Sequence, residues 1–292
     1  MIRSTYPAKP GFVIKNSFIE PAVLLSADVG FQVPLAYTFP CPLEILNIVN
    51  TSLLPDPDIL LESGAVLVMN KPGGLLTQGP PGIDSLELRT KQFLKVRDEK
   101  PGKVYLGVPH RLDRPVSGVM VVVKNVRAAK RISEQFQKRT VTKKYWAIVS
   151  GGLSSESGTW SDWMRKVPDE ARSEIVEETE TGAKHAVLHY RVVESSGDLS
   201  LLEIELETGR THQIRLQCGS RGYPIVGDTL YGSEISFGPQ TDDLRQRWIG
   251  LHARRLAFIH PIAREPVDQV APLPECWLGF DSFETIKHAG EV

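Results

Sequence analysis

HRLDRPVSG, at residues 110–118, places a single carboxylate, Asp113, among three side chains that are cationic or can become so. A short run rich in β-forming residues precedes it at 103–108, and an apolar run follows it at 119–123. The nine residues are therefore predicted to form a loop between two strands of one sheet. Loops held by a rigid sheet often carry functional groups, so Asp113 is the first candidate residue. An Asp–Arg pair in a loop is also an ordinary structural feature, and the rest of the chain has to decide between the two interpretations.

Composition limits the possible classes of protein. The chain has 292 residues, of which 41% are hydrophobic and 24% charged, and its formal net charge is -1. These values predict a soluble globular protein, and a nearly neutral chain can bind nucleic acid only through local patches. Three widely spaced cysteines lack the pattern of a zinc site and favour a reduced, cytoplasmic compartment. No apolar run reaches the roughly 18 residues that cross a bilayer, so no membrane partner is expected.

Three segments are expected along the chain. Eight prolines interrupt residues 1–58, which are predicted to pack on the main body as an irregular extension. The main domain is predicted over 59–274. The remaining residues, 275–292, are predicted to form a peripheral helix or tail.

The pattern of the main domain predicts an α+β fold. A helix is expected over 85–96 with Asp84 as its cap, and a second helix begins after Asn125. The acidic stretch 156–180 is interpreted as a hairpin insertion. Other strands are expected at 65–69, 143–151, 184–193, 199–207, 256–259 and 267–270. Because strands and helices do not alternate regularly, a mixed, largely antiparallel sheet is favoured over a doubly wound one.

The segment 124–144 is strongly basic. It carries eight lysines and arginines against one acid, Glu134. Most charge runs are solvated helix faces. The density of this run, and its position after the loop with Asp113, also fit a surface that binds the phosphate backbone of RNA. Both interpretations remain open for the four candidate contacts of its helix, Lys130, Arg131, Lys138 and Arg139.

Four strings in register resemble the ribosomal large subunit type of pseudouridine synthase. They are NKPGG at 70–74, HRLDRPVSG at 110–118, KKYWAIVSG at 143–151, and TGRTHQIRLQ with GYPIVGDTLYG at 208–232. The resemblance covers about 59–273 and implies an eight-stranded mixed sheet flanked by helices and loops. Many members of this family also carry a small amino-terminal RNA-binding domain of the S4 type, whose pattern is not recognisable in residues 1–58. One departure is Val116, which stands where the family usually has threonine.

The resemblance implies a reaction and three catalytic residues. Pseudouridine formation breaks the N-glycosidic bond, turns the uracil over and joins its C5 to the same sugar carbon, so neither a redox cofactor nor a metal is expected. Asp113 corresponds to the carboxylate that acts at the ribose, by attack on the anomeric carbon or by removal of a sugar proton. Arg210 corresponds to the arginine that pairs with it and keeps it ionised. Tyr145 corresponds to the tyrosine that stacks on uracil and assists deprotonation at C5.

The resemblance also implies RNA contacts. Enzymes that act on a base extrude it from its helix. His110 and Arg111 are predicted to fill the vacated space or to hold the flipped nucleotide, and Arg111 is favoured because a planar guanidinium can stack there. Further candidate contacts, each with a structural alternative, are Arg114, Lys71, His212, Gln213 and Arg215. The expected partner is ribosomal or transfer RNA, and the protein is expected to be a monomer without an obligatory protein partner.

Two other classes of function are weighed against this one. The chain could be an RNA-binding module on the same scaffold without catalysis, but Asp113, Tyr145 and Arg210 are all retained. It could also hydrolyse nucleosides or glycosides, although such enzymes normally present a second carboxylate, which no motif supplies beside Asp113. Isomerisation leaves the mass of RNA unchanged, whereas a hydrolase releases free uracil.

Overall fold

A single mixed sheet forms the frame of the protein in the computed structural model, which describes residues 54–289. Its strands are β1 (Asp58–Ser63), β2 (Val66–Lys71), β3 (Ser117–Val123), β4 (Thr142–Ser150), β5 (Ser157–Lys166), β6 (Ser173–Val176), β7 (Lys184–Ser196), β8 (Leu199–Leu206), β9 (Leu251–Ile259) and β10 (Pro266–Val270). The extension predicted at 1–58 lies outside the described residues as far as residue 53.

The order of the strands is β1, β2, β3, β9, β4, β8, β7, β5 and β6, and β10 pairs with β9 beside this path. The pair β3 and β9 is parallel, and the other pairs within residues 54–289 are antiparallel. The α+β class with a mixed, largely antiparallel sheet is therefore confirmed. The described sheet has ten strands, however, and not the eight that the resemblance implied.

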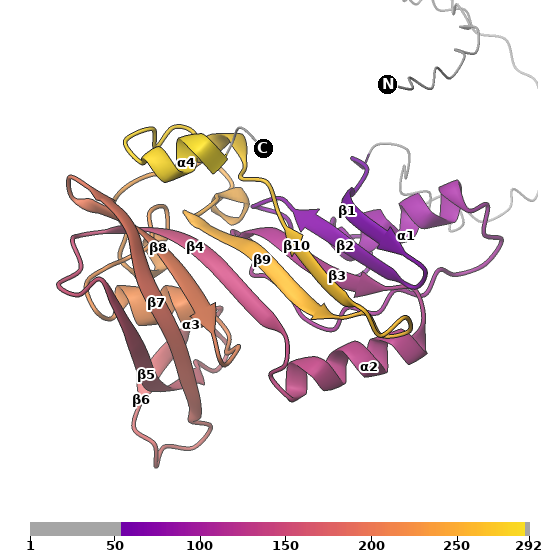
Figure 1. Ribbon diagram of the computed structural model, residues 1–292, viewed down its shortest axis with the longest axis horizontal. Coiled ribbons are helices and arrows are strands. Elements are labelled where there is room, and N and C mark those ends of the chain that lie inside the picture. The colour runs from indigo at the N-terminus through magenta and orange to yellow at the C-terminus, as the bar shows by residue number, and fades with distance from the viewer. Residues whose placement is uncertain (1–53, 290–292) are drawn as a thin grey trace, which may run out of the picture. The chain divides into compact units, whose positions relative to one another are not determined.

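Four α-helices and three short 3-10 turns accompany the sheet within the described residues. The helices are α1 (Leu86–Arg97), α2 (Val126–Gln137), α3 (Gln213–Gly219) and α4 (Glu284–Ala289), and the turns are η3 (Thr229–Tyr231), η4 (Leu244–Gln246) and η5 (Glu275–Trp277). Figure 1 shows α1 and α2 beside the half of the sheet that contains β1, β2 and β3, whereas β5 to β8 form the other half. The two halves of the sheet therefore meet where β9 pairs with β4.

The helix caps follow local side-chain chemistry. Asn125 caps α2 as predicted, because its Oδ1 accepts the Ala128 N–H at 2.8 Å. The predicted cap of α1, Asp84, is wrong. Ser85 is the cap, since its Oγ accepts the Leu88 N–H, while Asp84 forms an ion pair with Arg89.

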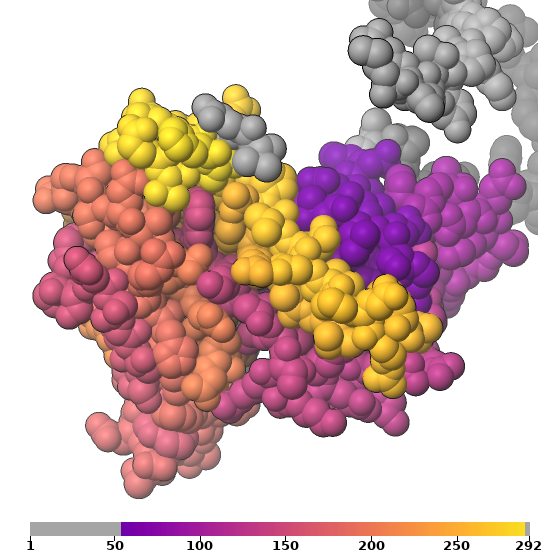
Figure 2. Space-filling view, viewed as in Figure 1, coloured from indigo at the N-terminus to yellow at the C-terminus, as the bar shows by residue number. Residues whose placement is uncertain are grey.

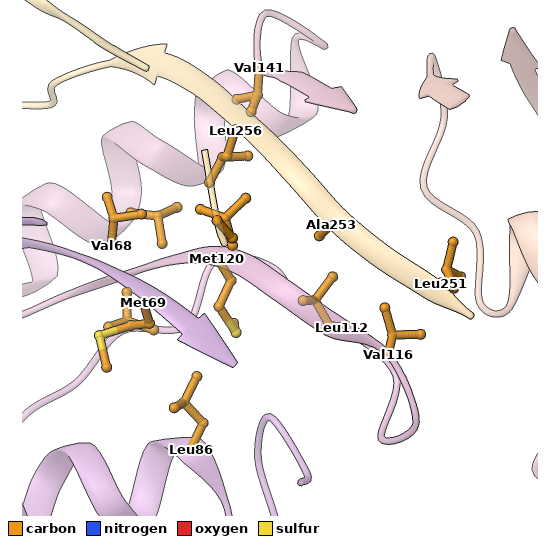
Figure 3. Close-up of a cluster of buried hydrophobic side chains, with 14 of the residues drawn as sticks. Val68, Met69, Leu86, Leu112, Val116, Met120, Val141, Leu251, Ala253 and Leu256 are labelled. Atoms are coloured by element: carbon orange, nitrogen blue, oxygen red, sulfur yellow. The ribbon is translucent and has the colours of Figure 1, made fainter. Parts of the chain in front are cut away.

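The core holds both ends of the 110–118 loop. Val68, Met69 and Met120 of the central strands are fully buried, and Figure 3 shows Leu112 and Val116 in the same apolar cluster. Leu112 is 5% exposed and Val116 only 2% exposed. A valine at position 116 thus packs into the core, where the family's usual threonine would present a hydroxyl. Asp113 lies between two anchored apolar residues, and this anchoring limits its movement.

The strand predicted at 103–108 is absent. Gly107 makes one isolated bridge with Val123, with N–H···O distances of 2.7 and 2.9 Å, and the rest of the segment is irregular. Prolines at 101 and 109, which lack a backbone N–H, flank this segment and prevent strand pairing from extending beyond it in either direction.

The carboxyl-terminal segment belongs to the body of the protein. The helix expected in this segment is present as α4, but Trp277, Phe283 and Ile286 are fully buried against Ile148 and Leu201. In the space-filling view of Figure 2 the yellow carboxyl-terminal residues lie directly on the orange segments. The expectation of a peripheral tail is therefore corrected for the part of this segment that the structure describes. No helix within residues 54–289 has both the length and the apolar character needed to cross a membrane.

Candidate active site

The NKPGG turn and the residues just after it hold the loop of Asp113 through hydrogen bonds. Thr77, just after the turn, donates its hydroxyl to the Leu112 carbonyl at 2.8 Å and accepts the Leu112 N–H at 3.2 Å. Arg114 donates its Nε to the Gly74 carbonyl at 2.9 Å. These contacts fix the residues on both sides of Asp113 to a segment about 40 positions earlier in the chain.

Lys71 is part of this support and not a surface contact. Its Nζ donates to the carbonyl oxygens of Pro72, Leu75 and Arg114, at 2.8, 2.7 and 3.3 Å, and the residue is fully buried. Burial lowers the pKa of Lys71 to about 7, and the charge of Asp113 opposes that shift. The expectation that Lys71 contacts RNA is therefore wrong. A lysine at a strand end is usually exposed, and nothing in its local sequence reveals three converging carbonyls.

The guanidinium that faces Asp113 belongs to Arg215. Arg215 Nη1 lies 3.7 Å from Asp113 Oδ2, and the Arg215 residue is only 5% exposed. Arg210, the predicted partner, instead donates its Nε to the His185 carbonyl at 2.8 Å. His212 separates the two arginines with a left-handed backbone, φ 55°, and α3 begins immediately after it. The chain turns at this point, so the arginine of the first turn of α3 faces the loop.

Asp228 orients Arg215. Its two carboxylate oxygens accept from Arg215 Nε and Nη2 at 2.7 and 2.8 Å, a bidentate pair with both side chains buried. Burial lowers the pKa of Arg215, but the hydrogen bonds and charge of Asp228 outweigh it and raise the value overall, so Arg215 stays charged. By residue type alone, beside Gly227, Asp228 resembles an ordinary turn former. Its position within the GYPIVGDTLYG string is the signal that could have marked it as a site residue.

His212 lies on the other side of Asp113. Its Nε2 is 3.7 Å from Asp113 Oδ2, and its Nδ1 is hydrogen bonded to the hydroxyl of Tyr231 at 2.9 Å. Burial lowers the pKa of His212, although Asp113 opposes this shift. The ring is therefore neutral at pH 7, and Arg215 supplies the positive charge beside the carboxylate.

Tyr145 of β4 completes the group. It lines a cavity of about 90 Å³ together with Asp113, Arg210 and Arg215. Burial, and to a smaller extent the negative charge of Asp113, raise the pKa of Tyr145 above its ordinary value. The phenol consequently stays protonated at neutral pH, which favours stacking and hydrogen bonding over action as a phenolate base.

Two other predicted RNA contacts brace the fold. His110 accepts the Val121 N–H on Nε2 at 2.9 Å and stacks on Phe136 at 4.6 Å, and burial lowers its pKa to about 3. Gln213 is buried and bonds to three groups, the Thr208 hydroxyl, the Arg210 N–H and the Val187 carbonyl. The buried Gln213 side chain thus braces the segment before α3. His110 still lines a cavity but uses its acceptor internally.

Three adjoining cavities surround the loop. One of about 450 Å³ is lined by Asp113, Arg114, His212 and Arg215, and another of about 560 Å³ by His110, Phe136, Lys143, Tyr145 and Arg210. The smaller cavity of about 90 Å³ shares residues with both. Arg111 is exposed and lines all three. Asp113 is therefore reachable from a cleft of nucleotide size, with its side chain 24% exposed.

The basic run is partly neutralised. Arg139 pairs with Glu207 at 2.7 Å, and Arg131 donates to the Pro261 carbonyl at 2.7 Å. Lys130 and Lys138 are exposed and form no ion pair with any residue in 54–289. Arg139 also lines the cavity of about 560 Å³, so only the carboxyl-terminal end of α2 borders the cleft.

Comparisons with known proteins agree in naming one activity. A family model described as RNA pseudouridylate synthase matches residues 65–220. Ribosomal large subunit pseudouridine synthase D of Xylella fastidiosa is 38% identical over 244 residues, which are 80% of this chain and 72% of that protein. An uncharacterized RNA pseudouridine synthase of Synechocystis is 34% identical over 224 residues, and the match spans 74% of this chain but less than two thirds, 65%, of that relative. Among solved structures, human RNA pseudouridylate synthase domain containing 4 has a TM-score of 0.62 at 25% identity, covering 80% of this chain and 93% of that one.

Proposed function

Since the chain belongs to the RNA pseudouridine synthase family, we propose that it isomerises a uridine of structured RNA with Asp113 as the carboxylate that acts at the ribose. The environment of the Asp113 side chain supports this proposal most directly. Its carboxylate borders a cleft of nucleotide size, faces Arg215 at 3.7 Å, and shares a cavity with Tyr145. An isomerase of this family rearranges bonds within one nucleotide, so all of its chemistry can occur in such a cleft.

Arg215 keeps Asp113 ionised and oriented. A guanidinium near a carboxylate in a partly buried cleft stabilises the charged form, and Asp228 holds this guanidinium in place from its other edge. An ionised carboxylate can attack the anomeric carbon of the ribose or remove a sugar proton, and both routes begin with the same charged group. Arg215 therefore takes the role that the motif resemblance implied for Arg210.

Tyr145 holds the uracil while its glycosidic bond is broken. A neutral phenol presents an apolar ring for stacking and a hydroxyl that can donate to a base oxygen. At the final step C5 of the rejoined base gives its proton to the Asp113 carboxylate, which is ionised again once the bond from C5 to the sugar carbon has formed, and the Tyr145 hydroxyl assists by hydrogen bonding to the base.

Arg111 takes the place of the extruded nucleotide. It is exposed, lies two residues before Asp113 and borders all three cavities, so a flipped base and the space that it leaves would both be within its reach. His212 and Arg114, which line the cavity of about 450 Å³, contact the nucleotide held there.

The substrate is ribosomal or transfer RNA, and the Xylella relative named for the large ribosomal subunit favours ribosomal RNA. The protein acts in the cytoplasm as a monomer that needs neither a metal nor a cofactor. A hydrolase is disfavoured because Asp228, the other carboxylate bordering the cavity of about 450 Å³, has both oxygens bound to Arg215 and cannot serve as its second acid.

The decisive test replaces Asp113 with asparagine. Pseudouridines are mapped in total RNA from cells with the gene, without it, and with Asp113→Asn, and the purified variant is measured for RNA affinity. We expect the variant to form no product and to bind RNA within a few fold of the native protein. The matched control is Asp242→Asn, which neutralises an exposed carboxylate on a nearby loop. Ordinary turnover by Asp113→Asn, or release of free uracil by the native protein, would overturn the proposal.

A further inference from the structure

The NKPGG turn also carries a second loop, 238–250. A Cβ added to Gly73 would lie 2.4 Å from the ring of Trp248, and one added to Gly74 would lie 2.6 Å from the Gln246 carbonyl oxygen. Gly238 approaches the same tryptophan, since a Cβ there would lie 3.1 Å from Trp248 Cβ. Gly73 and Gly74 are therefore needed for close contact with Trp248 and Gln246, besides their role in the turn.

This contact joins two loops to one support. Gly74 accepts a hydrogen bond from Arg114 on one side and packs beside Gln246 and Trp248 on the other. The side chain between Gln246 and Trp248 is Arg247, which lines the cavity of about 450 Å³ together with Asp113. Trp248 thus fixes the position of Arg247 relative to the loop of Asp113.

The charges of this cavity are not balanced by residues within 54–289. Five arginines and two aspartates line it. Arg215 is paired with Asp228, and Arg245 with Asp243 at 3.2 Å. The remaining three have no carboxylate within 4.0 Å in the part of the chain that the structure describes, and they are Arg111, Arg114 and Arg247.

Arg247 is well suited to hold an anion. It is partly buried, and its Nε makes only a long hydrogen bond of 3.4 Å to the Thr241 carbonyl. A guanidinium in this situation has lost part of its hydration without gaining a counter-charge from the described residues, and its planar fork fits the oxygens of a phosphate. In an RNA substrate the uracil and the ribose are neutral, so the anion that reaches this cavity is the phosphodiester.

We propose that Arg247, with Arg114, binds the backbone phosphate next to the target uridine and that Trp248 is its positioning residue. The proposal rests on the proposed function for its substrate. Because both arginines are attached to the NKPGG turn, the bound phosphate lies at a fixed distance from Asp113 and sets which nucleotide enters the cavity.

The test compares two arginines of one loop. Arg247→Gln and Arg245→Gln remove the same charge two residues apart, but Arg245 is already paired and its side chain is 79% exposed. Binding to an unmodified transcript of large-subunit ribosomal RNA is measured between 50 and 200 mM salt, about the range where phosphate contacts dominate. We expect Arg247→Gln to reduce the slope of log K against log salt by about 0.7 to 0.9, the value of one lost phosphate contact, and Arg245→Gln to leave it unchanged.

Kinetics and a conservative variant complete the design. Arg247→Gln should raise KM by about tenfold and leave kcat within about threefold, and Arg247→Lys should restore the slope because it restores the charge. Trp248→Ala should raise KM by a similar factor. The double variant Trp248→Ala with Arg247→Gln should have the same KM as Arg247→Gln alone, because Trp248 acts through Arg247. Trp248→Phe should restore the native KM. Thermal unfolding of each variant checks that the fold is intact.

The outcomes separate the two proposals. If the native protein forms pseudouridine but Arg247→Gln keeps the native salt slope and KM, the phosphate site is refuted and the proposed isomerase activity stands. Equal losses in Arg245→Gln and Arg247→Gln would show a general effect of charge and would also refute it. Absence of pseudouridine formation by the native protein on any cellular RNA would instead refute the proposed function.

Discussion

Two basic regions of the molecule differ in what their charges face. On α2 and just after it, Arg131 donates to a backbone carbonyl and Arg139 is neutralised by Glu207. In the cleft, Arg111, Arg114 and Arg247 border a cavity and have no carboxylate partner within residues 54–289. The first region is denser in the sequence, but its charges lie along and just after a helix, whereas the three arginines of the second border the same cavity as Asp113. The density of lysine and arginine along a chain is therefore a weaker sign of an RNA site than the surface that each charge faces.

After Asp113→Asn, the largest effect is expected in the cleft, at Arg215. Arg215→Gln leaves the buried carboxylate of Asp228 without its partner, which should cost about 3 to 5 kcal/mol of unfolding free energy. It also removes the positive charge beside Asp113, which should lower kcat by at least about 10²-fold. Urea unfolding and single-turnover formation of pseudouridine measure the two losses.

A double variant separates folding from catalysis at this position. Arg215→Gln with Asp228→Asn removes both charges of the buried pair, so most of the stability should return. Activity should remain low, because Asp113 still lacks its guanidinium. Recovery of activity together with stability would mean that Arg215 serves only the fold and that the cleft is not the charged site described above.

Arg111→Ala is expected to have the next largest effect. Loss of one stacking side chain against a base corresponds to about 1 to 3 kcal/mol, or roughly a five- to 150-fold fall in kcat/KM. Stability should stay within about 0.5 kcal/mol of native, because Arg111 is exposed. Arg111→Lys keeps the charge but not the planar group, so activity close to native in this variant would indicate that Arg111 binds phosphate rather than stacking.

The sequence predicted the elements and segments that form the cleft better than the contacts between side chains within it. The strand after Asp113, the hairpin insertion of β5 and β6, and the Asn125 cap depend on local patterns, and the structure agrees with them, whereas the strand predicted before Asp113 is absent. The motif strings also identified the right segments of the cleft. Within those segments, the choice between Arg210 and Arg215 depended on the left-handed turn at His212, and a non-glycine residue carries no sequence sign of that conformation.

Long-range contacts account for the other differences. Lys71 has the sequence context of a surface lysine, yet its three acceptors come from the turn itself and from a loop 43 residues away. Asp228 and Trp248 act through partners that lie 13 and more than 170 positions away. Periodicity and capping rules concern neighbours within about one or two turns, so they predict elements but not these pairs.

Arg210→Ala should have a smaller effect than its motif position indicates. The variant loses one hydrogen bond to the His185 carbonyl, a loss of about 1 kcal/mol or roughly fivefold in kcat/KM. The resemblance alone predicts a loss nearly as severe as that of Asp113→Asn. Measuring Arg210→Ala and Arg215→Gln side by side at saturating RNA decides between the two arginines, and a greater loss of kcat in Arg210→Ala would restore the original assignment.

The smallest effect is expected on α2. Lys130 and Lys138 are its exposed lysines without an ion pair in the described residues, so the double variant Lys130→Gln and Lys138→Gln tests whether the helix contacts RNA. A true phosphate contact at each would lower the salt slope by about 1.4 to 1.8 in total. We expect a change below about 0.5 and less than a threefold loss of affinity, because the cleft residues carry the contacts.

The matched control neutralises two exposed lysines of the other half of the sheet, Lys166 and Lys184, and so changes the net charge equally. If both double variants weaken binding alike, the protein's overall charge attracts RNA and α2 has no special part in it. If only the α2 variant lowers the slope by more than one, the RNA extends from the cleft across this helix, past the Arg139–Glu207 pair, and that pair must open when RNA binds. Repeating the measurement with Glu207→Gln, which frees Arg139 in advance, would then raise affinity, whereas a helix that faces only solvent would show no such gain.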